Sequence, residues 1–252
     1  MKLGGSTLGA HDTSLQDIAS ARRAGRQVVV VHGGGAAVSG WLSRLGIDPL
    51  FERGLRVTDS ATLDVVVAIL AGLVNKTLVA GLSALGAPAI GLSGADSLIL
   101  QAQRYDDALG YVGRVERVNH FPIDELLRLG YLPVIAPIAI ETDAKADAAQ
   151  LLNVNADTAA GAIAAAVAAE LLVFLTDVPG VLDETKRLVP QLSASEAELM
   201  IASGAADGGM VPKLEAAIAA AVAGCATRIV DGTSGGMLTR VLAGEPVGTT
   251  VG

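Results

Sequence analysis

Residues 28–35, VVVVHGGG, place three consecutive glycines after four valines and a histidine. The β-branched run predicts a buried strand, and a helix-compatible sequence begins at Ala36. A glycine turn at this point leaves backbone N–H groups free to face an anion, where a helix N-terminus adds partial positive charge. The stretch therefore favours a phosphate or carboxylate site. A plain tight turn is the alternative that this segment alone leaves open.

The rest of the chain alternates short apolar runs with longer helical runs, which predicts an α/β fold with a mainly parallel sheet. Thr58 or Asp59 is placed to cap the longest predicted helix. Helices are predicted at 36–45, 60–85, 122–129, 155–169, 193–203 and 211–223. Strands are predicted at 28–31, 88–92, 132–140 and 171–175, with an antiparallel hairpin within 97–118 and the last core strand at 228–230.

The 252 residues suffice for one large domain, which we expect to have two lobes. The polar loop 141–150 divides an N-lobe of about 1–150 from a C-lobe of about 151–252. The apolar run 159–175 contains Glu170 and is too short for a bilayer span, so it predicts a buried helix followed by a strand. We expect no membrane partner.

The formal charge of −8 argues against a nucleic-acid partner, which needs a basic surface. The chain has one cysteine, Cys225, which cannot form an internal disulfide; its apolar surroundings predict a buried structural thiol in a reducing cytoplasm.

The common nucleotide motifs G-x-x-x-x-G-K-[ST] and G-x-G-x-x-G are absent from the sequence. The three histidines, His11, His32 and His120, lack metal-ligand spacing, and we expect no protein-bound metal. His32 precedes the glycine turn, where a structural hydrogen-bonding role is favoured over catalysis.

Five separated segments combine lysine, arginine, asparagine and aspartate with glycine turns. They are KLGGS (2–6), the glycines 33–35, GLRVT (54–58), NVNAD (153–157) and DGGMVPK (207–213). With AGLVNKTL (71–78) and LTDVPGVL (175–182), they resemble the amino acid kinase family over nearly the whole chain, and most of all its members that act on N-acetyl-L-glutamate. The order and spacing of the segments carry the resemblance.

The resemblance implies a three-layer αβα sandwich and transfer of the ATP γ-phosphoryl group to the side-chain carboxylate of N-acetyl-L-glutamate. A carboxylate with a pKa near 4.3 is already ionised at neutral pH, so the reaction needs charge cancellation and in-line positioning instead of a general base. The resemblance also implies that Mg²⁺ arrives with the ATP phosphates.

The catalytic roles also follow from the resemblance. Lys2 and Lys213 flank the transferred phosphoryl group, and Asp157 holds both lysines. A helix-dipole carboxylate is the alternative for Asp157, and a solvated surface position is the alternative for each lysine taken alone. The glycine N–H groups serve as donors: Gly5 and Gly35 to the phosphoryl oxygens, and Gly34 to the attacking carboxylate.

Arg56 is similar to the family's anchor for the substrate α-carboxylate, which suits its planar guanidinium. Asn153 resembles a residue that binds the same end of the substrate, with a turn or cap role as the alternative. Asn75 and Lys76 match the family but are expected to serve helix packing. The resemblance places the nucleotide against Asp177, Gly180, Leu182, Gly208, Gly209 and Met210.

The family resemblance further implies a homodimer that meets along helix 60–85 and belongs to the arginine-insensitive class. Family members carry several apolar residues before the first lysine, so we expect a chain extended upstream of Met1 to be more stable and more active. Two alternatives stay open for the function: a sibling kinase acting on aminoadipate or glutamate linked to a carrier protein, and a non-catalytic amino-acid sensor. A nicotinamide oxidoreductase is a distant third.

Overall fold

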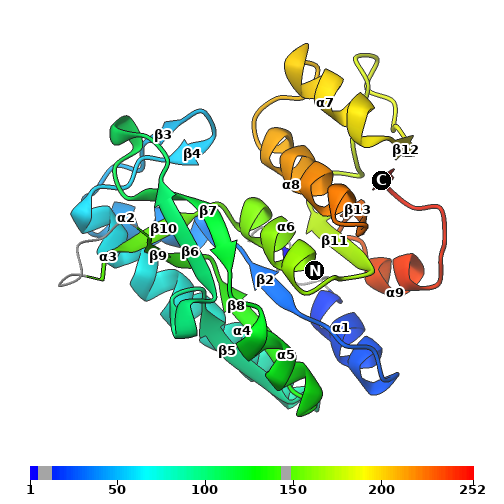
Figure 1. The fold of residues 1–252 in the computed structure, drawn as a ribbon, viewed down its shortest axis with the longest axis horizontal. Helices are drawn as coiled ribbons and strands as arrows, with labels where there is room; N and C mark the ends of the chain where they lie inside the picture. Colours follow the sequence, from blue (N-terminus) through cyan, green and yellow to red (C-terminus); the bar gives the residue numbers. More distant parts are fainter. Residues whose placement is uncertain (5–12, 143–148) are drawn as a thin grey trace.

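The computed structural model describes residues 1–4, 13–142 and 149–252. Its centre is an eight-stranded sheet in the order β12-β14-β13-β11-β1-β2-β8-β5 (Figure 1). The strands are β1 (Lys2–Leu3), β2 (Val30–His32), β5 (Ala89–Ser93), β8 (Leu132–Ala136), β11 (Leu171–Thr176), β12 (Gln191–Leu192), β13 (Ala226–Asp231) and β14 (Thr249–Val251). All neighbours are parallel except β13 and β14, so the predicted mainly parallel sheet is confirmed.

Strand β1 is short but lies in the middle of this sheet. Lys2 pairs with Val31 of β2 on one side and with Phe174 of β11 on the other. Beyond β1, the Gly33 N–H donates to the Leu3 carbonyl at 2.9 Å. These pairings place Lys2 next to the glycine turn that follows β2.

Alternate residues of the strands enter two different cores, which is the signature of a sheet buried on both faces. Val30 and Val173 pack on one side, whereas Val31 and Phe174 pack on the other. The first face is covered by α1 (Ser14–Arg23), α4 (Asn75–Ala84) and α9 (Met237–Leu242). The second is covered by α5 (Phe121–Arg128), α6 (Ala156–Ala166) and α8 (Met210–Val222), with α7 (Ala194–Ala202) packed on α8. The predicted three-layer αβα sandwich is confirmed.

A second group of strands stands beside one end of the central sheet. β6 (Leu100–Arg104), β7 (Val112–Val118), β9 (Ile138–Glu141) and β10 (Leu151–Val154) pair in a closed ring. The predicted hairpin within 97–118 is confirmed as the antiparallel pair of β6 and β7. A smaller hairpin, β3 (Phe51–Glu52) and β4 (Leu55–Arg56), precedes the long helix.

The long helix predicted at 60–85 is confirmed, with one irregular segment. It comprises α3 (Ser60–Val67), the π-helical segment η1 (Ala68–Val74) and α4. By length and composition alone, the 25 residues Ser60–Ala84 could cross a membrane. An 18-residue window of this helix has a mean hydropathy of 2.1, and 33% of that window is buried. Leu78 and Leu82 of this helix are buried in the core on the central sheet, as in the core helices of folded domains.

The carboxyl-terminal end of the fold differs from the sequence-based expectation. The strand predicted at 228–230 is confirmed as β13, but the prediction that it is the last core strand is wrong, because β14 adds a further strand antiparallel to β13. β14 has three residues, too few for an alternating pattern to be detected in the sequence. The predicted strand region 132–140 divides at Pro137 into β8 and β9, which belong to different sheets.

The two-lobe division stays a prediction. The central sheet is continuous across it, since β1 and β2 lie between β8 and β11. Part of the loop that was predicted to divide the lobes, 143–148, lies outside the described residues.

Asp59 caps the long helix by accepting the Thr62 N–H at 2.8 Å, and this bond lowers the carboxyl pKa below 3.8. We expect Asp59→Ala to lower the free energy of unfolding by about 1 kcal/mol at pH 7. Because the folded pKa is depressed, the contribution is present above pH 3.8 and is lost as the pH falls through the lower folded value. Urea unfolding at pH 7 and pH 3 measures both effects.

The matched control is Asp64→Ala, which removes an exposed carboxylate from the same helix without removing a cap. Equal unfolding free energies for the two variants at pH 7 would contradict the assignment of the cap.

Candidate functional site

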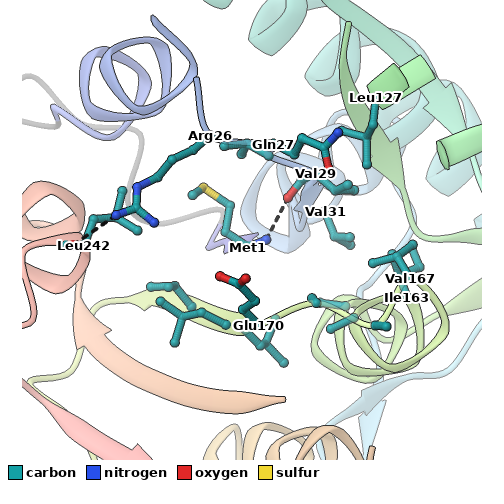
Figure 2. A pocket seen from close by; sticks show the side chains of 18 of the residues that line it. Met1, Arg26, Gln27, Val29, Val31, Leu127, Ile163, Val167, Glu170 and Leu242 are labelled. Atoms are coloured by element: carbon teal, nitrogen blue, oxygen red, sulfur yellow. Dashed lines mark hydrogen bonds between the residues drawn. The ribbon is translucent and has the colours of Figure 1, made fainter. Parts of the chain in front are cut away.

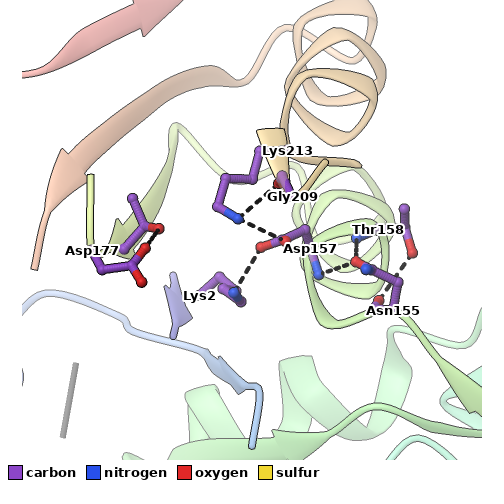
Figure 3. Close-up of polar contacts among 8 residues, drawn as sticks. Lys2, Asn155, Asp157, Thr158, Asp177, Gly209 and Lys213 are labelled. Atoms are coloured by element: carbon purple, nitrogen blue, oxygen red, sulfur yellow. Dashed lines mark hydrogen bonds and ion pairs between the residues drawn. The ribbon is translucent and has the colours of Figure 1, made fainter. Parts of the chain in front are cut away.

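One buried carboxylate joins two buried lysines at the carboxyl end of the central strands (Figure 3). Lys2 Nζ lies 2.9 Å from Asp157 Oδ1, and Lys213 Nζ lies 3.2 Å from Asp157 Oδ2. The three residues are only 5–9% exposed. The structure thus brings together the three charged residues that the sequence predicted as catalytic, although they come from β1, α6 and α8.

The backbone fixes this arrangement from two helix starts. Asn155 caps α6, and its Oδ1 accepts the N–H groups of Asp157 and Thr158 at 2.8 and 3.2 Å. Asp157 therefore sits in the first turn of α6, where the helix dipole favours a carboxylate. Lys213 lies in the first turn of α8, and its ammonium also donates to the Gly209 carbonyl at 3.0 Å.

The charges of this cluster do not cancel. Two ammonium groups share one carboxylate, which leaves one formal positive charge in a site with little solvent exposure. Charge pairs are screened less there than at the surface. The cluster is therefore suited to an additional anion.

The glycine turn lies beside this cluster and supplies backbone donors. Gly34 has a φ of 159°, and a Cβ there would lie 2.6 Å from Leu70 Cδ2, so a larger residue is both strained and obstructed. Gly35 is the first residue of α2 (Gly35–Arg44), and the first N–H groups of a helix have no intrahelical partner. The turn therefore leads directly into a helix start, and anion binding by its N–H groups stays a prediction.

A cavity of about 230 Å³ connects these parts. Its lining residues include Lys2, Gly34, Gly35, Arg56, Asn153 and Asp157. Six of the residues predicted from separate sequence segments therefore face one space. The space brings cations, backbone donors and an amide together.

Arg56 presents an incompletely satisfied guanidinium at this cavity. Its Nη2 donates to the Gly35 carbonyl at 3.0 Å and to Ser39 Oγ at 2.8 Å, while Phe51 covers its face with the ring centroid 4.7 Å from Cζ. Its Nη1 is buried without a hydrogen-bond partner in the described part of the chain. Burial lowers the pKa of Arg56 because it disfavours the charged guanidinium. A ligand carboxylate would satisfy both the charge and the free donor.

Asn153 lies on β10 at the opposite wall. Its Nδ2 donates to Thr58 Oγ1 at 3.1 Å, and that hydroxyl donates in turn to the Arg56 carbonyl at 2.7 Å. The asparagine is thus linked to the strand that carries Arg56. The link supports a shared role for Asn153 and Arg56 at one end of a ligand.

The residues predicted to bind the nucleotide lie outside this cavity. Asp177 follows β11, and its Oδ1 accepts from Thr176 Oγ1 at 3.2 Å (Figure 3). Gly180 has a φ of 148°, and a Cβ there would lie 2.6 Å from Thr249 Oγ1, so packing against β14 already requires glycine. Leu182 bridges to Leu188, whereas Gly208, Gly209 and Met210 lead into α8. Their nucleotide roles stay predictions, and Gly5 lies outside the described residues.

A larger cavity, of about 430 Å³, lies beside Met1 at the amino-terminal ends of the central strands β2 and β11 (Figure 2). The Met1 amino group donates to the Val29 carbonyl at 2.7 Å, and burial lowers its pKa to about 6. It therefore supplies little positive charge at neutral pH. Glu170 also lines the cavity, and neither Lys2 nor Lys213 does, so this space does not share the chemistry of the lysine site.

Ser39 and Phe51, which hold the Arg56 guanidinium, could not be predicted from the sequence. Neither lies in a recognisable motif, because both reach Arg56 only through the folding of α2 and the β3–β4 hairpin. The cap at Asn155 could have been found, since an asparagine directly before an apolar helix is a start signal. The structural role predicted for His32 is confirmed by its hydrogen bonds to Gly33 and Asn75.

Comparisons with known proteins identify the family of this chain. A family model described as the amino acid kinase family matches residues 1–231. An acetylglutamate kinase of Dehalococcoides mccartyi is 46% identical over 252 residues, which cover 100% of this chain and 93% of that protein. An acetylglutamate kinase of Methanopyrus kandleri is 48% identical over 217 residues, covering 82% and 86% of the two chains.

Solved structures share the fold. A Streptococcus mutans UA159 protein, smu.665, is 28% identical with a TM-score of 0.83, covering 99% of this chain and 96% of that one. Carbamate kinase from Giardia lamblia has 18% identity and a TM-score of 0.71, covering 99% and 96%, which shows the fold alone. The chain belongs to the amino acid kinase family.

We expect Asp157 to stabilise the fold by pairing with Lys2 and Lys213. Asp157→Asn leaves two buried ammonium groups without their counter-charge, so we expect the free energy of unfolding at pH 7 to fall by about 3 kcal/mol. Urea unfolding followed by circular dichroism measures this. Asp207→Asn, at an exposed acidic residue of the neighbouring loop, removes the same charge and should change little. Similar losses in both variants would contradict the prediction.

Proposed function

We propose that this chain transfers the γ-phosphoryl group of ATP to the side-chain carboxylate of N-acetyl-L-glutamate, giving N-acetyl-L-glutamyl 5-phosphate in arginine biosynthesis. The observation that carries the proposal is the pair of lysines held by one carboxylate beside a glycine turn, at a cavity that also exposes Arg56. The full-length similarity to acetylglutamate kinases supports the choice of substrate.

In the proposed reaction a carboxylate oxygen attacks the γ-phosphorus, and the bond from that phosphorus to the β–γ bridging oxygen breaks. The electron pair leaves with ADP, and no proton moves because the nucleophile is already an anion. The difficulty is therefore the approach of two anions. Lys2 and Lys213 offset this repulsion, and the excess positive charge of their cluster is matched to the transferred group.

Positioning follows from the remaining residues of the cavity. The Arg56 guanidinium and Asn153 hold the α-carboxylate end of the substrate. The Gly34 N–H donates to the attacking carboxylate, while those of Gly5 and Gly35 donate to the phosphoryl oxygens. Asp157 takes no part as a base, because both its oxygens are engaged by lysines.

The nucleotide is proposed to lie on the side of β11 and α8, against Asp177, Gly180, Leu182, Gly208, Gly209 and Met210. Among the described residues, no group of three or more His, Cys, Asp or Glu side chains is placed to hold a metal ion. Mg²⁺ would bind the ATP phosphates and offset their charge.

We also propose a cytoplasmic homodimer that meets along the long helix. The outer side of this helix exposes Leu73 and Ala80 with Lys76 and Thr77 between them, and Leu73 is 50% exposed. A mixed surface of this kind can form a two-fold contact in which the helix meets its own copy.

The test is ADP release with Mg-ATP and N-acetyl-L-glutamate, with hydroxylamine trapping of the acyl phosphate. Free glutamate, aspartate and α-aminoadipate are run alongside. We expect trapped product with the acetylated substrate alone. ATP binding without product from any of these acceptors would reject the proposed substrate and favour a carrier-linked acceptor or a sensor.

A substitution of the anchor tests the orientation of the substrate. Arg56→Lys keeps the charge but loses the planar fork, so we expect the KM for N-acetyl-L-glutamate to rise about 10- to 100-fold. The KM for ATP should change little because Arg56 lies on the acceptor side. Arg117→Lys, at an exposed arginine of β7, is the matched control. A rise confined to the KM for ATP would refute the assignment.

A further inference from the structure

His32 and Asn75 form a buried polar connection that the proposed chemistry does not use. His32 is 1% exposed and Asn75 is fully buried. His32 ends β2 directly before the glycine turn, whereas Asn75 begins α4 in the long helix. Neither residue lines the 230 Å³ cavity. Burying two polar side chains is costly unless their hydrogen bonds are satisfied, so their contacts need an explanation.

The two hydrogen bonds of the His32 ring indicate which of its nitrogens carries the hydrogen. His32 Nδ1 lies 2.8 Å from the Gly33 carbonyl oxygen, which can only accept, so Nδ1 carries the hydrogen. His32 Nε2 lies 3.1 Å from Asn75 Nδ2 and accepts from it. Burial lowers the pKa of His32, and the nearby Lys76 charge lowers it further, in agreement with a neutral ring. One tautomer therefore serves both contacts.

The Asn75 amide joins three neighbouring strands. Its Nδ2 also lies 2.9 Å from the Val134 carbonyl of β8 and 3.2 Å from the Leu92 carbonyl of β5, so its two hydrogens are shared among three acceptors, of which His32 Nε2 is one. Its Oδ1 accepts from Lys76 Nζ at 3.1 Å, which fixes the orientation of the amide. Gly91 leaves the room for it, because a Cβ at that position would overlap Oδ1. The expectation that Asn75 serves helix packing alone is therefore incomplete.

The long helix also contacts the glycine turn behind Gly34. A Cβ at Gly34 would lie 2.6 Å from Leu70 Cδ2 and 3.3 Å from Val74 Cγ2, so both side chains close the space behind this glycine. Leu70 and Val74 belong to the π-helical segment, which directly precedes Asn75. A π-turn changes the direction of the residues that follow it, and such segments are frequent at functional sites.

We propose that Asn75 acts through His32 as a positioning residue for the glycine turn. The Asn75–His32–Gly33 connection holds the Gly34 and Gly35 N–H groups at the point where the attacking carboxylate and the phosphoryl oxygens meet. This inference rests on the proposed function for the identity of the bound groups. It assigns to the long helix a role in the chemistry of the site in addition to its role in the core.

The experiment compares Asn75→Leu, His32→Asn and the double variant. Asn75→Leu removes the amide donors at similar volume, and His32→Asn can keep a donor to Gly33 while losing the reach to Asn75. Leu82→Ala is the control, since it truncates a fully buried core side chain of the same helix and lowers stability without touching the connection.

We expect kcat to fall about 10- to 100-fold in both single variants, as for a displacement of donors on the order of 1 Å. The double variant should lose no more than the larger single loss, because both changes break one connection. The KM for ATP should stay near that of the unaltered protein. Leu82→Ala should keep its kcat below the temperature at which it unfolds.

A second readout needs no substrate. Backbone hydrogen exchange of the Gly33–Gly35 amides should accelerate in Asn75→Leu and His32→Asn but not in Leu82→Ala. Additive kcat losses, or exchange in the turn that matches the control, would overturn the proposal. Absence of kinase activity in the unaltered protein would reject the proposed function instead, and the exchange data would then decide the connection by themselves.

Discussion

The ion pairs of Asp157 with Lys2 and Lys213 are the constraint on which the rest of the site depends. Asp157 holds both buried ammonium groups because the central strand β1 and the first turns of α6 and α8 meet at one point. In this fold α6 follows β10 of the ring of strands and α8 follows α7, and the first turns of both helices lie beside β1 of the central sheet. The fold and the positive charge of the site are therefore one arrangement.

The glycine turn illustrates how backbone and packing serve the same purpose. Gly34 is required by its φ of 159° and by Leu70 behind it, and the same residue lines the cavity. The long helix that supplies Leu70 also supplies Asn75 and the outer face proposed for dimer contact. This helix therefore contacts both the core of the fold and the glycine turn.

Much of the site could be predicted from the sequence because its residues lie in compact glycine-containing segments. Lys2, Arg56, Asn153, Asp157 and Lys213 were assigned before any contact was known, and all but Lys213 line one cavity, with Lys213 joined to it through Asp157. Ser39 and Phe51 were missed, since their only signal is proximity to Arg56. β14 was missed because three residues carry no measurable periodicity.

The sequence by itself determined the alternation of strands and helices, the glycine turn after β2, the cap of the long helix and the residue types of the site. These are local properties, set by backbone conformation and by side-chain patterns within a few residues. Only the tertiary structure decided which oxygen of Asp157 meets which lysine, that Arg56 keeps a free donor, and that Asn75 joins three strands to His32. Such contacts depend on distances between residues far apart in the chain, and hydrogen bonds and ion pairs form only when those distances are right.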